Sequence, residues 1–241
     1  MTQQFSTIAA GGILSVLLAS CAIPPPPAGP LSIPVPREST GAKVDAADDA
    51  IGNDTAPAPT AVPETKAPER LLPTGLLEIG ESAAPLTVMM FTEHHCGYCK
   101  DFDTDAFPSL RQEFIDTGKV KLQIGILPLK KYLDSDLSAM GLLCAAQQGK
   151  GVAMHSLLFT LAARDADAQA KAAGKIGIDP KKFASCLKND STKAMLESEK
   201  SLAHTLDVTL VPTLFIGGEK SVGLPYYEDL RGAIEKAMND R

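Results

Sequence analysis

Two cysteines separated by two residues carry the clearest chemical signal in this sequence. They stand in Cys96-Gly97-Tyr98-Cys99, directly after an apolar run and at the start of a helical pattern. Unpaired backbone N–H groups and the positive end of the helix dipole stabilise an anion at a helix N-terminus, which favours the Cys96 thiolate. The spacer brings Cys99 one turn along, within reach of a disulfide with Cys96. The pattern predicts thiol–disulfide exchange through a mixed disulfide on Cys96 that Cys99 resolves.

Two other uses of such a pair fit the sequence less well. A zinc site needs a second pair of ligands, and Cys144 and Cys186 each stand alone without CxxC or HxxxH spacing. Covalent haem attachment needs a histidine directly after the second cysteine, where this chain has Lys100. Redox chemistry is therefore favoured over both.

The elements that must position the pair can be read from the apolar pattern. Residues 86–91 form a continuous apolar run, as expected for a buried central strand, and they end just before the cysteines. A helical pattern with a kink expected at Pro108 follows, and residues 120–124 alternate like the next strand. Residues 76–79 predict a further short strand before this unit.

The second half of the chain predicts a helical block and then a return to the sheet. Residues 134–206 are rich in Ala, Leu, Lys and Gln with helical spacing, interrupted by three glycines and by Pro180. Residues 213–216 predict a strand, and residues 226–238 predict an amphipathic helix. This order of elements indicates one α/β domain over residues 71–241.

The N-terminus has the features of an export signal. Residues 8–20 are apolar, uncharged and too short to span a bilayer, and they lead into Leu18-Ala19-Ser20-Cys21. This run resembles a bacterial lipobox, which implies that residues 1–20 are removed and that Cys21 carries lipid. A plain signal peptide that happens to contain a cysteine is the alternative. A lipidated Cys21 would leave four other cysteines, an even number.

Residues 21–70 have the composition of a tether. Eleven of the 18 prolines lie between Ala22 and Arg70, and the segment has hardly any aromatic or periodic apolar residues. Such a segment cannot bury enough surface to offset the entropy of ordering it, so we expect a disordered, proline-rich linker. The formal net charge of −6 argues against nucleic-acid binding, which requires clustered Lys and Arg.

Three segments together resemble the DsbA-like branch of the thioredoxin superfamily. They are the segment 91–100 around the two cysteines, Ala153-Met154-His155-Ser156-Leu157-Leu158-Phe159, and Val211-Pro212-Thr213-Leu214-Phe215-Ile216-Gly217-Gly218. The resemblance extends from about residue 75 to the C-terminus. It implies a thioredoxin-like α/β fold with a helical subdomain inserted at about residues 130–207. It also implies a cis Val211–Pro212 bond that shapes a peptide-binding surface beside Cys96, whereas the general preference of X–Pro bonds favours trans.

The sequence departs from that family at two places. A buried acid often stands six residues before the first cysteine, where this chain has Met90, and Glu93 is the nearest carboxylate. The strongest oxidants have a histidine before the second cysteine, where this chain has Tyr98. Tyr98 carries no positive charge to favour the Cys96 thiolate. His94 and His95 either supply partial charge or are solvated loop residues.

Cys144 and Cys186 fall on predicted helices of the inserted block. Free buried cysteines are common core residues, whereas two leftover cysteines in one exported subdomain are expected to pair. Some DsbA-like proteins of alphaproteobacteria have a second bridge at similar positions, so the resemblance implies a Cys144–Cys186 disulfide.

These observations favour a thiol–disulfide oxidoreductase that needs no cofactor and oxidises dithiols of exported proteins. It would work as a monomer in the bacterial envelope, lipid-anchored and facing the periplasm, with a membrane redox partner. Ala22 after the lipid cysteine favours the outer membrane. A disulfide reductase or isomerase is one alternative, because Gly-Tyr resembles the isomerase dipeptide. A copper-handling lipoprotein using Cys96, Cys99 and His94 or His95 is another, since thiolate and imidazole suit copper.

Overall fold

A mixed sheet organises residues 67–241, which are the residues that the computed structural model describes. Its strand order is β1-β2-β4-β3-β5-β6, in which β3 and β4 run parallel and every other neighbouring pair is antiparallel. The strands are β1 (Glu69–Leu71), β2 (Leu77–Ile79), β3 (Leu86–Thr92), β4 (Val120–Ile126), β5 (Thr213–Ile216) and β6 (Glu219–Val222).

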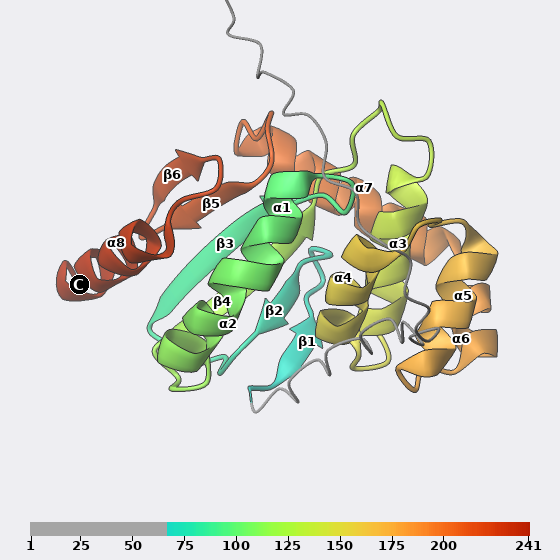
Figure 1. Cartoon of the computed structure of the whole chain (residues 1–241), viewed down its shortest axis with the longest axis horizontal. Helices are drawn as coiled ribbons and strands as arrows, with labels where there is room; N and C mark the ends of the chain where they lie inside the picture. The colour runs from blue at the N-terminus through green and yellow to red at the C-terminus, as the bar shows by residue number, and fades with distance from the viewer. Residues whose placement is uncertain (1–66) are drawn as a thin grey trace, which may run out of the picture. The chain divides into compact units, whose positions relative to one another are not determined.

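A helical crossover joins the parallel strands β3 and β4, as parallel pairing requires. It packs across one face of the sheet in Figure 1. Its successive parts are α1 (Gly97–Asp101), η1 (Phe102–Ala106), α2 (Phe107–Leu110) and η2 (Arg111–Ile115). The two η segments are wider π-helical turns on either side of α2. Pro108 lies in the first turn of α2 and has no N–H to donate, so the interruption expected at this proline takes the form of these wider turns.

Five helices fill the interval between β4 and β5, and a last helix follows β6. Figure 1 shows α3 to α6 beside the sheet and α7 behind it. The breaks after α3 and before α6 fall at Gly149 and Pro180. The helices are α3 (Ser135–Ala146), α4 (Gly151–Thr160), α5 (Ala166–Lys175), α6 (Pro180–Cys186), α7 (Asp190–Thr205) and α8 (Tyr227–Asn239).

The central strand β3 packs against other elements on both of its faces, and alternation along the strand assigns its side chains to them. Val88 and Met90 belong to the main core together with Phe102 of the crossover. Phe91 points to the opposite face, into a second cluster that includes Ala203 of α7. The active-site cysteines therefore follow a strand that is held from both sides.

The folded domain begins earlier than residue 71. Strand β1 starts at Glu69 and pairs antiparallel with β2, so residues 67–70 do not belong to a tether. The Glu69 carboxylate also accepts the backbone N–H groups of Gly151 and Val152, at 2.5 and 3.0 Å, where α4 begins. The expected signal peptide, Cys21 and the rest of the tether lie outside the described residues.

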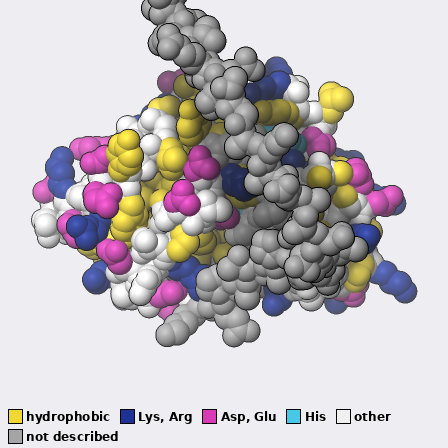
Figure 2. Space-filling view, viewed as in Figure 1, with side chains coloured by type: hydrophobic (Ala, Val, Ile, Leu, Met, Phe, Trp, Pro, Cys, Tyr) yellow, Lys and Arg dark blue, Asp and Glu magenta, His cyan; other side chains and the backbone are white. Residues whose placement is uncertain are grey.

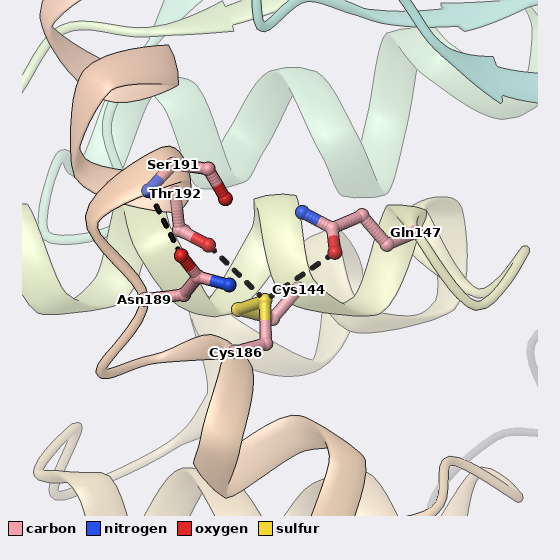
Figure 3. The surroundings of a disulfide bond; sticks show 6 residues. All are labelled: Cys144, Gln147, Cys186, Asn189, Ser191 and Thr192. Carbon is pink, nitrogen blue, oxygen red and sulfur yellow. Dashed lines mark hydrogen bonds between the residues drawn. A yellow bond between two sulfur atoms is a disulfide. The ribbon is translucent and has the colours of Figure 1, made fainter.

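A disulfide closes the helical block from within. Cys144 of α3 and Cys186 of α6 are bonded, with an S–S distance of 2.04 Å and a sequence separation of 42 (Figure 3). The Thr192 hydroxyl lies 3.3 Å from the Cys186 sulfur and is the donor of that contact, since a disulfide sulfur has no proton. The bridge adds a covalent link between α3 and α6, which also pack together in the main core. No helix within residues 67–241 is both long and apolar enough to cross a membrane.

Candidate active site

Cys96 sits at the N-terminal end of α1, directly after the strand β3 and its short loop. It is the N-cap residue with extended backbone angles, and its carbonyl accepts the N–H of Lys100 at 3.1 Å. Cys96 is half-buried, and both Cys96 and Cys99 are free thiols. The helix therefore presents its unpaired N–H groups beside a sulfur that an approaching thiol can reach.

Cys99 lies one turn inside the same helix and is fully buried. Burial raises the pKa of the Cys99 thiol far above its usual value, and the neighbouring Cys96 adds to the shift. The buried Thr92 hydroxyl at the end of β3 opposes this shift in the pKa of Cys99. The two cysteines thus differ in accessibility, as thiol–disulfide exchange requires: the Cys96 sulfur is accessible and the Cys99 sulfur is protected.

The Val211–Pro212 peptide bond is cis and faces this pair. The Cys96 thiol donates to the Val211 carbonyl oxygen with an Sγ–O distance of 3.6 Å. Pro212 is buried immediately before β5, which pairs with β3. The pairing of β5 with β3 thus places the cis bond beside Cys96, although Cys96 and Val211 are 115 residues apart in the sequence.

A groove of about 290 Å³ opens beside Cys96. Tyr98 and Leu210 flank it with apolar side chains that are 67% and 62% exposed. The opposite wall comes from the segment between β4 and α3, through Leu129, Lys131 and Tyr132. The groove is open to solvent and largely apolar, as expected of a surface that holds an extended peptide next to the reactive sulfur.

His94 and His95 are not solvated loop residues. His94 is 2% exposed, with its Nε2 atom 3.1 Å from Nδ1 of His155 and its Nδ1 atom 3.1 Å from the Ser138 hydroxyl. Burial lowers the pKa of His94 well below its usual value, and the nearby His155 and Arg164 lower it further. Burial lowers the pKa of His155 as well, although Asp103 opposes that shift. Helices α3 and α4 supply these partners, which is why the loop pattern alone suggested exposure.

His95 is also engaged, on the side of the loop that faces the groove. Its Nδ1 atom is 2.7 Å from Glu93 and its Nε2 atom is 2.9 Å from Asp134. Both loop imidazoles therefore contact partners other than Cys96 and Cys99. This geometry gives the copper-handling alternative no support, and no cluster of three or more potential metal ligands occurs within residues 67–241.

The acid that many relatives bury below the second cysteine is absent here. Met90 occupies that position and is buried in the main core. Glu93 is fully buried, but its carboxylate accepts hydrogen bonds from His95 and Ser135. Sequence reasoning missed a second buried acid, Glu199 of α7, which accepts the Ile126 N–H at 3.3 Å. Burial raises the pKa of Glu199 well above its usual value.

Charge is mixed over the visible surface. Figure 2 shows acidic and basic side chains interspersed on the part of this face that is not grey. The pattern agrees with the absence of clustered Lys and Arg in the sequence. The distinctive surface of the site is therefore the apolar groove beside Cys96.

Comparison with known proteins gives a family model and several relatives that are similar to this chain. A family model described as thioredoxin matches residues 73–236. The disulfide bond formation protein D of Bacillus subtilis is 22% identical over 176 residues, covering 68% of this chain and 77% of that protein.

Two solved structures share the fold. The oxidised BdbD of Bacillus subtilis superposes with a TM-score of 0.63 at 21% identity, covering 71% of this chain and 97% of that one. A periplasmic thioredoxin-like protein from Salmonella enterica gives a TM-score of 0.59 at 23% identity, covering 70% and 92%.

Proposed function

The chain belongs to the thioredoxin family and is a thiol–disulfide oxidoreductase, and from this premise we propose that it oxidises dithiols in exported proteins. One observation carries the proposal. The half-buried Cys96 thiol lies 3.6 Å from the carbonyl oxygen of the cis Val211–Pro212 bond, while Cys99 is fully buried behind it. In this arrangement the Cys96 sulfur is accessible to a substrate, and the Cys99 sulfur is protected from it.

The reaction transfers two electrons from the substrate to the protein. A substrate thiolate attacks the Cys96 sulfur of the Cys96–Cys99 disulfide, and Cys99 leaves as a thiolate that takes up a proton. The second substrate thiol loses its proton and attacks the substrate sulfur of the mixed disulfide, which expels the Cys96 thiolate. The substrate gains a disulfide and the protein is left as a dithiol. A disulfide on a membrane redox partner restores the protein by the reverse exchange.

Each site residue has a proposed part in this reaction. Cys96 forms the mixed disulfide, and Cys99 is the leaving group or the resolving nucleophile. Val211 and Pro212 hold the substrate chain: the Val211 carbonyl already accepts a hydrogen bond from the Cys96 thiol and lines the groove. A valine before the cis-proline resembles the oxidases of the family. The name of the Bacillus relative, a disulfide bond formation protein, supports the same direction over a reductase or isomerase.

We propose that the protein works in the bacterial envelope. The apolar residues 8–20 and the following Cys21 support export and lipidation, with residues 1–20 removed. The proline-rich residues 21–66 would then tether the domain to the outer membrane on its periplasmic side. The Salmonella protein of the same fold is periplasmic, which supports the compartment.

Oxidation of a reduced, unfolded protein with two cysteines tests this function. Oxidised protein should form one substrate disulfide for each Cys96–Cys99 disulfide that is lost, and the Cys96→Ser variant should form none. The Cys144→Ala/Cys186→Ala variant is the matched control and should retain the reaction. Faster reduction of a disulfide substrate by the dithiol form than oxidation of the dithiol substrate would instead indicate a reductase.

A further inference from the structure

Glu93 is a buried hub directly before the active-site helix. Its side chain is fully buried and accepts three hydrogen bonds, each with a donor–acceptor distance of 2.7 Å. The donors are the backbone N–H and ring Nδ1 of His95 and the hydroxyl of Ser135. A carboxylate with three donors is well satisfied in the interior, so Glu93 is an anchor and not a free acid.

His95 bridges this anchor to a second carboxylate. Its Nδ1 atom meets Glu93 at 2.7 Å and its Nε2 atom meets Asp134 at 2.9 Å. Neither carboxylate oxygen can donate when ionised, so both ring nitrogens donate only when the ring carries two protons. The ring also stacks on Tyr132, with centroids 4.4 Å apart and an angle of 15° between the planes.

The segment between β4 and α3 has hydrogen bonds within itself and is attached to Glu93 and His95. The Leu129 N–H donates to the Ser135 hydroxyl at 3.0 Å, and the Tyr132 N–H donates to the Leu129 carbonyl at 2.9 Å. Ser135 in turn donates to Glu93. Both ends of residues 129–135, and the stacked Tyr132 between them, are therefore fixed through Glu93 and His95.

This segment is the wall of the groove that faces Leu210 and Val211. Leu129, Lys131 and Tyr132 line the groove together with Cys96. The tip is exposed at Leu133, so few packing contacts hold the wall from outside. Its position depends on polar contacts to the loop that carries the reactive cysteine.

We propose that His95 is a positioning residue whose ring, in contact with Glu93 and Asp134 and stacked on Tyr132, holds the 129–135 wall in place, so that the groove keeps a peptide substrate beside Cys96. The proposal rests on the proposed function, because it concerns the peptide that the groove presents to Cys96. Loss of the ring removes its contacts to Glu93, Asp134 and Tyr132 and releases the wall. Exchange with a peptide therefore depends on His95 more than exchange with a small thiol does.

Three side chains hold the His95 ring. Glu93 and Asp134 face its two nitrogens, and Tyr132 stacks on its ring. The Lys131 ammonium lies 4.8 Å from the centroid of the same Tyr132 ring. His94 precedes His95 in the chain but has its own buried partners.

The test compares two thiols that differ only in their need for the groove. Stopped-flow measurements follow the attack of a ten-residue peptide with one central cysteine, and of N-acetylcysteine amide, on the oxidised full-length protein. The ratio of the peptide rate to the small-thiol rate removes the effects that the two thiols share, including their ionisation. Misplacement of a positioning contact costs up to about a hundredfold, so we expect His95→Gln to lower this ratio about tenfold.

Three further variants give the test its control and its rescue. His204→Gln changes an exposed histidine of α7 and should leave the ratio unchanged. Asp134→Asn keeps a polar partner for the ring, because an amide can either accept from or donate to a ring nitrogen, and it should keep the ratio high. Asp134→Ala removes that partner from a half-exposed position and should lower the ratio, which allows the test even if His95→Gln does not fold.

The outcomes separate this proposal from the proposed function. Equal slowing of both thiols in His95→Gln, or an unchanged ratio in Asp134→Ala, would overturn the positioning role. A ratio in Asp134→Asn as low as that in Asp134→Ala would overturn it as well. If neither thiol reacts with the Cys96–Cys99 disulfide in the unmodified protein, the exchange function itself is wrong.

Discussion

The Cys96 thiol donates to the main-chain carbonyl of Val211, 115 residues away, at an Sγ–O distance of 3.6 Å. Antiparallel pairing of β3 with β5 brings the two together, because Cys96 follows β3 and the cis bond precedes β5. A substrate chain lying along the cis-proline therefore reaches the sulfur of Cys96 before any other thiol of the described domain. The sheet therefore brings the parts of the site together, and the N-terminus of the helix that starts at Gly97 stabilises negative charge on Cys96.

The Thr92 hydroxyl should speed the resolution of mixed disulfides. The buried Thr92 hydroxyl lowers the pKa of Cys99 against the larger effect of burial, and it can donate a hydrogen bond to the thiolate when Cys99 ionises, so Thr92→Val should make the Cys99 thiolate rarer. A lost hydrogen bond of about 1 kcal/mol corresponds to roughly a fivefold longer life of the mixed disulfide. Acid-quenched time courses with a single-cysteine peptide on Cys96 measure this lifetime, and Thr104→Val on the exposed surface is the control. An unchanged lifetime in Thr92→Val would remove Thr92 from the account.

The Cys144–Cys186 disulfide should stabilise the folded domain without taking part in exchange. Closing a loop of 42 residues contributes about 4 kcal/mol on the chain-entropy model. The Cys144→Ala/Cys186→Ala variant should therefore unfold at lower denaturant concentration, as measured by circular dichroism in urea. Its rate of dithiol oxidation under native conditions should match that of the unmodified protein. A lost oxidation rate in a folded variant would show that the bridge has a redox role.

The buried histidine pair should make the domain less stable in acid. Burial lowers the pKa values of His94 and His155 in the folded protein, whereas both titrate near pH 6.5 when the chain is unfolded. The unfolded chain then binds more protons below about pH 6.5, so the stability contribution is complete above that pH and is lost as pH falls. Each histidine can contribute a slope of up to about 1.4 kcal/mol per pH unit.

Urea unfolding between pH 5 and 8 measures this slope. His155→Gln should reduce the steepness of the stability loss below pH 6.5, whatever its effect at neutral pH. His204→Gln should keep the original slope, because this histidine is exposed. Equal slopes in all three proteins would mean that the buried pair does not titrate differently in the two states.

Anchoring through Cys21 is testable in cells. The unmodified protein should fractionate with membranes, and Cys21→Ser should either release it or block removal of the first 20 residues. Washing membranes with high salt separates a lipid anchor from surface charge, since only charge-based binding is screened. Unchanged processing and membrane association in Cys21→Ser would rule out the lipoprotein interpretation.

The sequence predicts the central elements well because their signals are local. The apolar run of β3, the alternation of β4 and the helical spacing of the inserted block each reflect burial that neighbouring residues reveal. Strands β1 and β6 escape this reasoning. Glu219–Val222 is exposed at every position, so pairing with β5 alone defines it. Glu69–Leu71 is only three residues long and is fixed by β2 and by the start of α4.

The site shows the same division between local and distant signals. The spacing of Cys96 and Cys99 is visible in the sequence, but the environment of the histidines between β3 and α1 is not. His94 meets His155, 61 residues further on, and His95 meets Asp134. Buried Glu199 reaches the end of β4 from α7, 73 residues after Ile126. A single sequence carries no local trace of such contacts, since each partner looks like an ordinary surface residue of its own helix or loop.

Trapping of the mixed disulfide tests the central claim most directly. The Cys99→Ser variant, reacted with a reduced substrate that has a single cysteine in the presence of a small disulfide oxidant, should accumulate a covalent complex. Mass spectrometry of its digested, non-reduced peptides should show the substrate linked through Cys96. The Cys96→Ser variant under the same conditions should form no such complex. A complex linked through another cysteine in Cys99→Ser, or an equally abundant complex on Cys99 in Cys96→Ser, would contradict the account.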